Sequence, residues 1–123
     1  MKVIMLSGPS NSGKTTVINE VYKMLTGSYF LPINRHKDFE CVIQYKGKNI
    51  AFQSAGDYSY NPINAMRKYV ALNYDILVCS HNNNKVNPLK EILKHNHVIF
   101  QKTQPFKNEA SCIIDANLIY NQI

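Results

Sequence analysis

Residues Lys2 to Leu25 read KVIMLSGPSNSGKTTVINEVYKML, and this stretch decides the fold. A β-rich apolar run, Val3 to Leu6, comes first, and the polar segment GPSNSGKT follows it. Beyond the polar segment, apolar residues recur with the spacing of one helix face, at Val17, Ile18, Val21, Tyr22 and Leu25. Gly27 stands where a left-handed cap would end a helix of this length. The stretch therefore predicts a strand, a glycine-rich loop and an amphipathic helix, in that order.

The glycine-rich loop has the residue types and the spacing of a phosphate-binding loop. Its octet fits G-x-x-x-x-G-K-[ST] without a mismatch. Gly8 and Gly13 allow the backbone to curl so that consecutive N–H groups point at one anion, and the N-terminus of the helix adds partial positive charge. We expect Lys14 to reach the β- and γ-phosphates of a nucleotide, Thr15 to coordinate Mg²⁺, and Thr16 to lie near the α-phosphate. The alternative is an ordinary Gly/Ser-rich turn. The predicted nucleotide-binding residues are Gly8, Pro9, Ser10, Asn11, Ser12, Gly13, Lys14, Thr15 and Thr16.

The segment GPSNSGKTT resembles the Walker A motif of the P-loop nucleoside triphosphate hydrolase superfamily. The resemblance covers roughly the first fifth of the chain. It implies a nucleoside triphosphate site with Mg²⁺ and a doubly wound, mostly parallel sheet. It does not imply which reaction takes place, because a fold does not fix a function.

The remaining segments predict a single α/β domain over residues 1–123, with about five strands, mostly parallel, and helices on both faces in three layers. We expect a β-hairpin over residues 41–54 with its turn at Lys46 to Lys48, and a strand over 75–81 that is buried on both faces. Other predicted elements are a strand over 28–33, a helix that begins at Pro62 with Asn61 as its N-cap, a helix from Pro88, a strand over 98–102 and a helix over 109–123.

Apolar spacing predicts the buried face of each later helix. We expect the helix after Asn61 to bury Ile63, Met66, Tyr69, Val70 and Leu72. The helix from Pro88 should bury Leu89, Ile92 and Leu93, and the last helix should bury Ala110, Ile113, Ile114, Leu118 and Ile119.

The expected catalytic residues are Lys14 and Asp57, and the expected Mg²⁺ ligands are Thr15 and Asp57. A hairpin followed by a glycine-containing loop resembles the small GTPase branch of the superfamily, in which a D-x-x-G motif senses the γ-phosphate. Here Gln53-Ser54-Ala55-Gly56 occupies that place, with Gln53 where the acid would stand. We therefore expect Asp57, just past a strand beside the phosphate loop, to hold a metal-bound water or to orient a nucleophile. Its alternative role is an Asx-turn residue.

Three further segments are candidates for contact with ligands. The loop over residues 34–40 carries the candidates Arg35, Lys37, Asp38 and Glu40. We expect this loop either to face a substrate or to be a solvated connection. Asn84-Lys85-Val86-Asn87 resembles the N-K-x-D guanine-reading motif with Asn87 in place of the aspartate, and we expect Asn87 instead to cap the helix from Pro88. ATP is therefore favoured over GTP. The loop over 103–108 lies near the nucleotide rim in many P-loop folds, and we expect its Phe106 either to stack on a base or to pack beneath the loop.

Composition narrows the class of protein. The chain has 123 residues and a net charge of +6, mostly from lysines. Because these lysines are dispersed, they favour a solvated surface, and a nucleic-acid partner has support from the net charge alone. Only two arginines are present, which limits a guanidinium clamp for phosphates. The three cysteines predict reduced, buried thiols. No apolar run approaches the ~18 residues that span a bilayer, and the first run is too short for a signal peptide, so we expect no membrane association and a cytoplasmic location.

The sequence thus predicts an ATP-binding protein with Mg²⁺-dependent hydrolysis or phosphoryl transfer. Two versions are open: a small kinase acting on a small-molecule acceptor, and an ATPase that works through a protein partner. Two alternatives remain, a nucleotide-binding module without catalysis and a GTPase-like switch.

Overall fold

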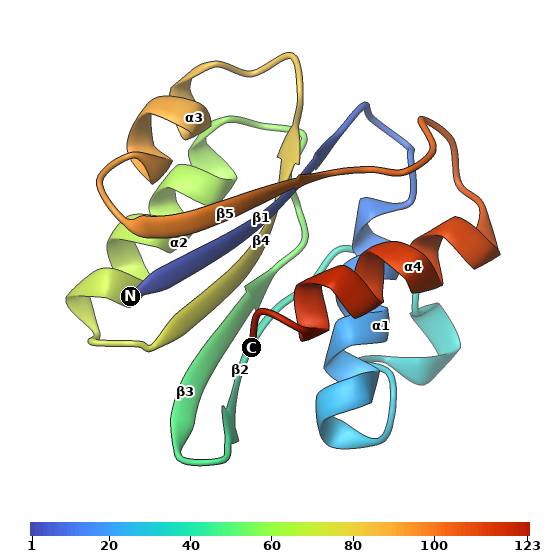
Figure 1. Cartoon of the computed structure of the whole chain (residues 1–123), viewed down its shortest axis with the longest axis horizontal. Helices are drawn as coiled ribbons and strands as arrows, with labels where there is room; N and C mark the ends of the chain where they lie inside the picture. The colour runs from blue at the N-terminus through green and yellow to red at the C-terminus, as the bar shows by residue number, and fades with distance from the viewer.

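The computed structural model describes residues 1–123 as an α/β fold around a five-stranded sheet (Figure 1). The strand order is β2-β3-β4-β1-β5, and only the β2–β3 pair is antiparallel. This confirms the predicted sheet and its hairpin. The elements are β1 (Lys2–Gly8), α1 (Lys14–Thr26), a 3-10 helix (Pro32–Asn34), β2 (Glu40–Tyr45), β3 (Lys48–Gln53), α2 (Tyr60–Ala71), β4 (Ile76–Asn82), α3 (Asn87–Ile92), β5 (Asn96–Gln101) and α4 (Glu109–Tyr120).

Strand β1 alternates its side chains between two cores. Ile4 and Leu6 pack with α1 and α4 on one face of the sheet, whereas Val3 and Met5 pack with α2 and α3 on the other. Figure 1 shows the two pairs of helices on opposite sides of the sheet. Because both faces are covered, a central strand is buried at every position, and β4 is buried from its first residue to its last, as predicted.

Helix α1 carries the phosphate-loop motif at its N-terminus and follows the predicted pattern. Val17, Ile18 and Val21 are fully buried against the sheet, and each contributes about 1.5–3 kcal/mol of hydrophobic stabilisation. Gly27 ends the helix at φ 94°, and its N–H donates to the carbonyl of Lys23. The left-handed glycine cap is therefore confirmed.

The segment over residues 28–33 was predicted as a strand, and this is wrong. The buried Asn19 amide bonds the backbone of Phe30 at both its N–H and its C=O, which holds the segment against α1 rather than in the sheet. Leu31 turns the chain at φ 49°, and the short 3-10 helix follows. Phe30 then stacks on Phe39 with ring centroids 4.8 Å apart.

The predicted contact face of α4 is also wrong, except at Ile119. Ile113, Ile114 and Leu118 are 44%, 53% and 43% exposed. The helix instead buries Ser111, Cys112, Asp115, Ala116 and Ile119. The reason is a buried ion pair, because Asp115 faces inward to bind Lys102 and fixes the rotation of the helix.

The starts and contact faces of α2 and α3 differ from the prediction as well. α2 begins at Tyr60 and α3 at Asn87, and neither helix has a side-chain N-cap, so the capping roles of Asn61 and Asn87 are wrong. In both helices the buried apolar face ends earlier than predicted. Three residues that were expected to be buried are exposed instead, namely Val70, Leu72 and Leu93, at 40%, 57% and 71%.

Strand β3 does not lie beside the phosphate loop, in contrast to the prediction. β4 pairs with β1 on one side and with β3 on the other, so it separates the two. The residues after β3 reach the loop only by crossing the end of β4. Gly56 makes this crossing, and its carbonyl accepts the N–H of Asn82 at 3.1 Å.

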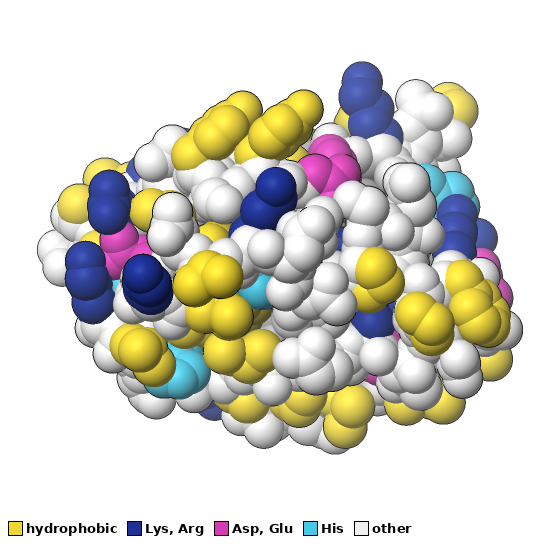
Figure 2. All heavy atoms as spheres, turned by 90° about the horizontal axis from the view of Figure 1, so that it is seen from above, with side chains coloured by type: hydrophobic (Ala, Val, Ile, Leu, Met, Phe, Trp, Pro, Cys, Tyr) yellow, Lys and Arg dark blue, Asp and Glu magenta, His cyan; other side chains and the backbone are white.

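Figure 2 shows the charged side chains on one face of the molecule. On the face drawn in Figure 2, Lys and Arg side chains are mostly scattered among uncharged atoms, except for a group beside acidic atoms at the left, over α3. None of the helices combines the length and the apolar character that crossing a bilayer requires.

Candidate functional site

A polar cleft lies at the carboxyl edge of the parallel strands, around the N-terminus of α1. It encloses about 360 Å³, and none of its twelve lining residues is hydrophobic. Ligands in doubly wound sheets bind at this edge. The lining residues are Asn11, Ser12, Gly13, Lys14, Thr15, Thr16, His36, Asp38, Ser54, Gly56, Asp57 and Lys107.

The loop between β1 and α1 presents unpaired donors to this cleft. Asn11 and Gly13 have φ of 57° and 91°, so the backbone curls in the left-handed region at two positions. The backbone N–H groups from Ser10 to Gly13 donate no hydrogen bond within the protein. The Ser12 hydroxyl is buried and has no partner either. A buried hydroxyl normally finds a partner, and free N–H groups beside a helix N-terminus attract negative charge, so this loop is suited to bind an anion.

Glycine is required at Gly8 because of close packing. A Cβ there would lie 2.7 Å from Cγ of Lys102. At Gly13, a Cβ would lie 3.2 Å from the Cys112 sulfur, in a backbone conformation that L side chains rarely adopt. The two motif glycines thus let the loop pack closely against Lys102, the residue after β5, and against Cys112 of α4.

The ammonium of Lys14 is turned back onto the loop. Its Nζ donates to the carbonyls of Pro9 at 2.6 Å and Gly8 at 3.1 Å, and the residue is buried. Desolvation lowers the pKa of Lys14, while the nearby charges of Asp57 and Asp38 oppose that shift. A buried cation with only carbonyl partners is arranged to exchange them for an anionic ligand.

Two carboxylates enter the cleft from different loops. Asp38 accepts a hydrogen bond from the Thr15 hydroxyl at 2.5 Å, and the same hydroxyl lies 3.4 Å from the carbonyl of Ser54. Asp57 accepts from the Ser10 hydroxyl at 3.1 Å. The structure thus brings both Thr15 and Asp57 to the cleft, but the acid in contact with Thr15 is Asp38.

The oxygen atoms around Thr15 fit Mg²⁺. This ion takes oxygen ligands, typically one or two from the protein, and fills its shell with phosphate oxygens and waters. A hydroxyl, a carboxylate and a carbonyl meet at Thr15. No cluster of three or more His, Cys, Asp or Glu side chains forms a metal site made by protein alone.

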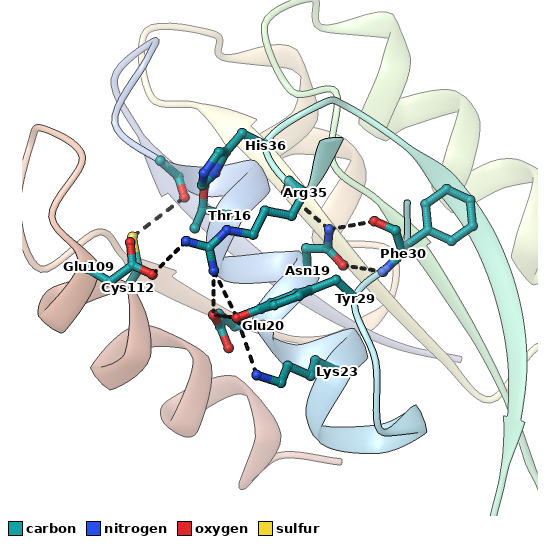
Figure 3. Close-up of polar contacts among 11 residues, drawn as sticks. Thr16, Asn19, Glu20, Lys23, Tyr29, Phe30, Arg35, His36, Glu109 and Cys112 are labelled. Carbon is teal, nitrogen blue, oxygen red and sulfur yellow. Dashed lines mark hydrogen bonds and ion pairs between the residues drawn. The ribbon is translucent and has the colours of Figure 1, made fainter. Parts of the chain in front are cut away.

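The segment that carries Asp38 is fixed to the helices by a polar network (Figure 3). The Asn19 amide donates to the carbonyls of Phe30 and Arg35. The Arg35 guanidinium donates to the Tyr29 hydroxyl at 2.9 Å and to Glu109 of α4 at 3.0 Å. Arg35 therefore connects the segment to α4 and does not line the cleft.

His36 and Lys107 complete the far side of the cleft. The hydroxyl of Thr16 is 2.7 Å from Nδ1 of His36. Desolvation, with the positive charges of Lys107 and Arg35, lowers the pKa of His36. Sequence reasoning did not single out Lys107, although it lies in the loop before α4 that was expected at the nucleotide rim.

The other predicted residues do not line the cleft, and only Gly8, Pro9 and Ser10 bond to residues that do. Gly8 and Pro9 hold Lys14, and Ser10 bridges Asp57 and the Asn82 amide. Asn87 lines a different groove, between α2 and α3. Phe106 is 56% exposed and does not pack beneath its loop. Gln53 is buried, and its Nε2 donates to the carbonyl of Ala55 at 2.6 Å.

Comparison with known proteins returned no match, whether to protein-family models, to curated proteins or to solved structures.

Proposed function

We propose that the chain is a P-loop protein that binds a nucleoside triphosphate with Mg²⁺ and hydrolyses it or transfers its terminal phosphoryl group. The observation that carries the proposal is the cleft itself. Free loop amides, Lys14 and the positive end of α1 converge on it, with two carboxylates within the same space. We propose ATP as the nucleotide.

Each group has a distinct part in this proposal. The amides from Ser10 to Gly13 bind the phosphate oxygens, and Lys14 leaves the carbonyls of Gly8 and Pro9 to neutralise the transferred group. Thr15 and Asp38 hold Mg²⁺, which when bound neutralises developing charge on the phosphates.

Asp57 is the candidate for activating or orienting the attacking hydroxyl or water. Its carboxylate is exposed within the cleft and is tied to Ser10 through one hydrogen bond. A carboxylate near the end of a strand, in reach of the phosphate loop, is suited to accept a proton or position a nucleophile.

The choice of ATP over GTP rests on the segment after β4. Asn87, which takes the place of the guanine-reading aspartate, lines the groove between α2 and α3 and not the phosphate cleft. A residue that recognises the nucleotide base would have to contact the nucleotide whose phosphates bind at the N-terminus of α1. The arrangement therefore offers no support for guanine recognition.

Calorimetric titration with Mg²⁺-ATP and Mg²⁺-GTP, followed by an assay for released phosphate, tests this proposal. We expect ATP to bind more tightly than GTP. Asp57→Asn should reduce phosphate release at least tenfold while ATP still binds, since a positioned base contributes about 10²–10⁴-fold. Asp75→Asn is the matched control, because Asp75 accepts the N–H of Asn49 away from the cleft. Phosphate release equal in all three proteins would contradict the catalytic role of Asp57.

A second candidate function is nucleotide binding without catalysis. It is favoured by Gln53, which lies at the end of β3 and binds its own loop, so that no acid extends from the strand end. Tight ATP binding with no phosphate release, with and without candidate acceptors, would favour this alternative.

A further inference from the structure

A second groove lies between α2 and α3, and its lining starts at Ser59, two residues after Asp57 of the phosphate cleft. It encloses about 500 Å³, within the range of ligand-binding sites. The residues relevant to binding are Tyr60, Asn64, Arg67, Asn87, Lys90 and Lys94. Figure 2 shows basic side chains gathered at the left of the view, over α3, beside acidic atoms.

The charges of this groove favour an anion. The buried Glu91 binds Nε of Arg67 at 2.6 Å and Nζ of Lys94 at 3.1 Å, so one carboxylate serves two cations. The side chain of Lys90 forms no ion pair or hydrogen bond, and the two terminal nitrogens of Arg67 have no partner. The cations outnumber the carboxylate, and their free donors are available to phosphate oxygens.

Two stacked tyrosines lie at the N-terminal end of α2, and one of them lines the groove. The rings of Tyr58 and Tyr60 have centroids 5.6 Å apart and planes 20° apart, although the residues are 61% and 59% exposed. Tyr60 lines the groove, and Tyr58 directly follows Asp57 of the phosphate cleft. Exposed aromatic rings beside a basic groove provide a stacking platform for unpaired bases.

We propose that this groove binds the base and phosphate of a nucleotide, either in a single-stranded nucleic acid or as a free mononucleotide. Tyr58 and Tyr60 stack on the base, and Arg67 and Lys90 bind the phosphate. The Asn64 and Asn87 amides, which line the same groove, are suited to bond base edges. An acidic peptide would match the charges but would have no use for the aromatic pair. The inference does not depend on the phosphate cleft binding ATP.

Fluorescence anisotropy with a labelled oligothymidylate of about ten nucleotides tests the proposal. Tyr58→Ala/Tyr60→Ala should weaken binding about 5- to 100-fold, the effect of losing base stacking, whereas Tyr58→Phe/Tyr60→Phe should retain it. Lys90→Ala should weaken binding and reduce the slope of log affinity against log salt by about one. Lys46→Ala, in the exposed turn of the β2–β3 hairpin, is the control for charge alone.

Competition experiments distinguish a nucleic-acid strand from a free nucleotide as the ligand, and one further variant shows which of the two sites binds it. Affinity that rises with oligonucleotide length identifies a strand as the ligand, and competition by thymidine monophosphate at similar concentration identifies a free nucleotide. Binding must also persist in Lys14→Ala, because binding lost in that variant would belong to the phosphate cleft. The proposal is overturned by the absence of binding at low salt, by tyrosine variants that bind like the wild type, or by polyglutamate that competes as well as the oligonucleotide.

Discussion

Replacing Asp115 with alanine should destabilise the protein more than any surface change. Asp115 and Lys102 form an ion pair of 2.9 Å whose side chains are each 1% exposed. Asp115 also accepts hydrogen bonds from the backbone N–H and the hydroxyl of Thr103. Alanine would remove all three acceptor contacts and leave the Lys102 ammonium inside the protein, with the Cys112 sulfur at 3.7 Å as its remaining partner.

The expected cost follows from this geometry. Removing one partner of a buried pair costs about 3–5 kcal/mol, because an uncompensated charge stays in the interior. A protein of this size is stable by about 5–15 kcal/mol, so the variant should lose a large part of its stability. Replacing both partners, as in Lys102→Met/Asp115→Leu, should cost far less, because no charge is left buried.

Urea denaturation followed by far-ultraviolet circular dichroism measures these differences in the wild type, in Asp115→Ala and in the double variant. Lys68→Ala is the control, since Lys68 pairs with Glu40 where both side chains are largely exposed, and its loss should cost no more than about 1 kcal/mol. The reasoning is refuted if Asp115→Ala also costs no more than about 1 kcal/mol, or if the double variant is less stable than Asp115→Ala.

Three other perturbations have defined outcomes. Gly56→Ala should cost about 1–3 kcal/mol in urea denaturation, because its Cβ would lie 2.5 Å from the Ser80 hydroxyl; a change below about 0.5 kcal/mol would contradict this packing. Asn19→Ala should accelerate hydrogen exchange at the Phe30 amide, which loses its 2.8 Å acceptor, and an unchanged rate would exclude the anchoring role. Burial lowers the pKa of His81, so the unfolded chain binds that proton more readily. The free energy of unfolding should be greatest above about pH 6.5 and fall as the pH drops toward the lower folded pKa, with a shallower fall in His81→Gln.

The parts of the fold that the sequence predicted correctly depend on local signals. The strand, loop and helix around Lys14 follow from neighbouring residues, and so do the β2–β3 hairpin and the buried run of β4. In the hairpin, Lys46 and Gly47 both have positive φ, as a tight two-residue turn requires.

The errors arise where long-range contacts decide the outcome. α4 has apolar residues around most of its circumference, so spacing does not select a face, and the inward pair of Asp115 with Lys102 reverses the usual preference for exposed charges. The segment over 28–33 has β-prone residues, but the distant Asn19 holds its backbone.

In the candidate site, too, local sequence signals predicted some residues, whereas others depend on long-range contacts. The motif residues from Asn11 to Thr16 lie in the cleft, where local spacing predicted them. Asp38 was only one of four candidates in its loop, because its contact with Thr15 depends on the bonds that Asn19 and Arg35 make to the rest of the segment. Lys107 reaches the cleft only because α4 packs against α1.

The most direct test of the proposed function compares the wild type with Lys14→Ala in calorimetric titrations with Mg²⁺-ATP. Lys14 has only loop carbonyls as hydrogen-bond partners, so its loss should leave the fold intact, which circular dichroism and urea denaturation can verify. We predict that the wild type binds ATP and that the folded variant does not. Equal ATP affinity in the two folded proteins would contradict the assignment of residues 8–15 as a phosphate-binding loop.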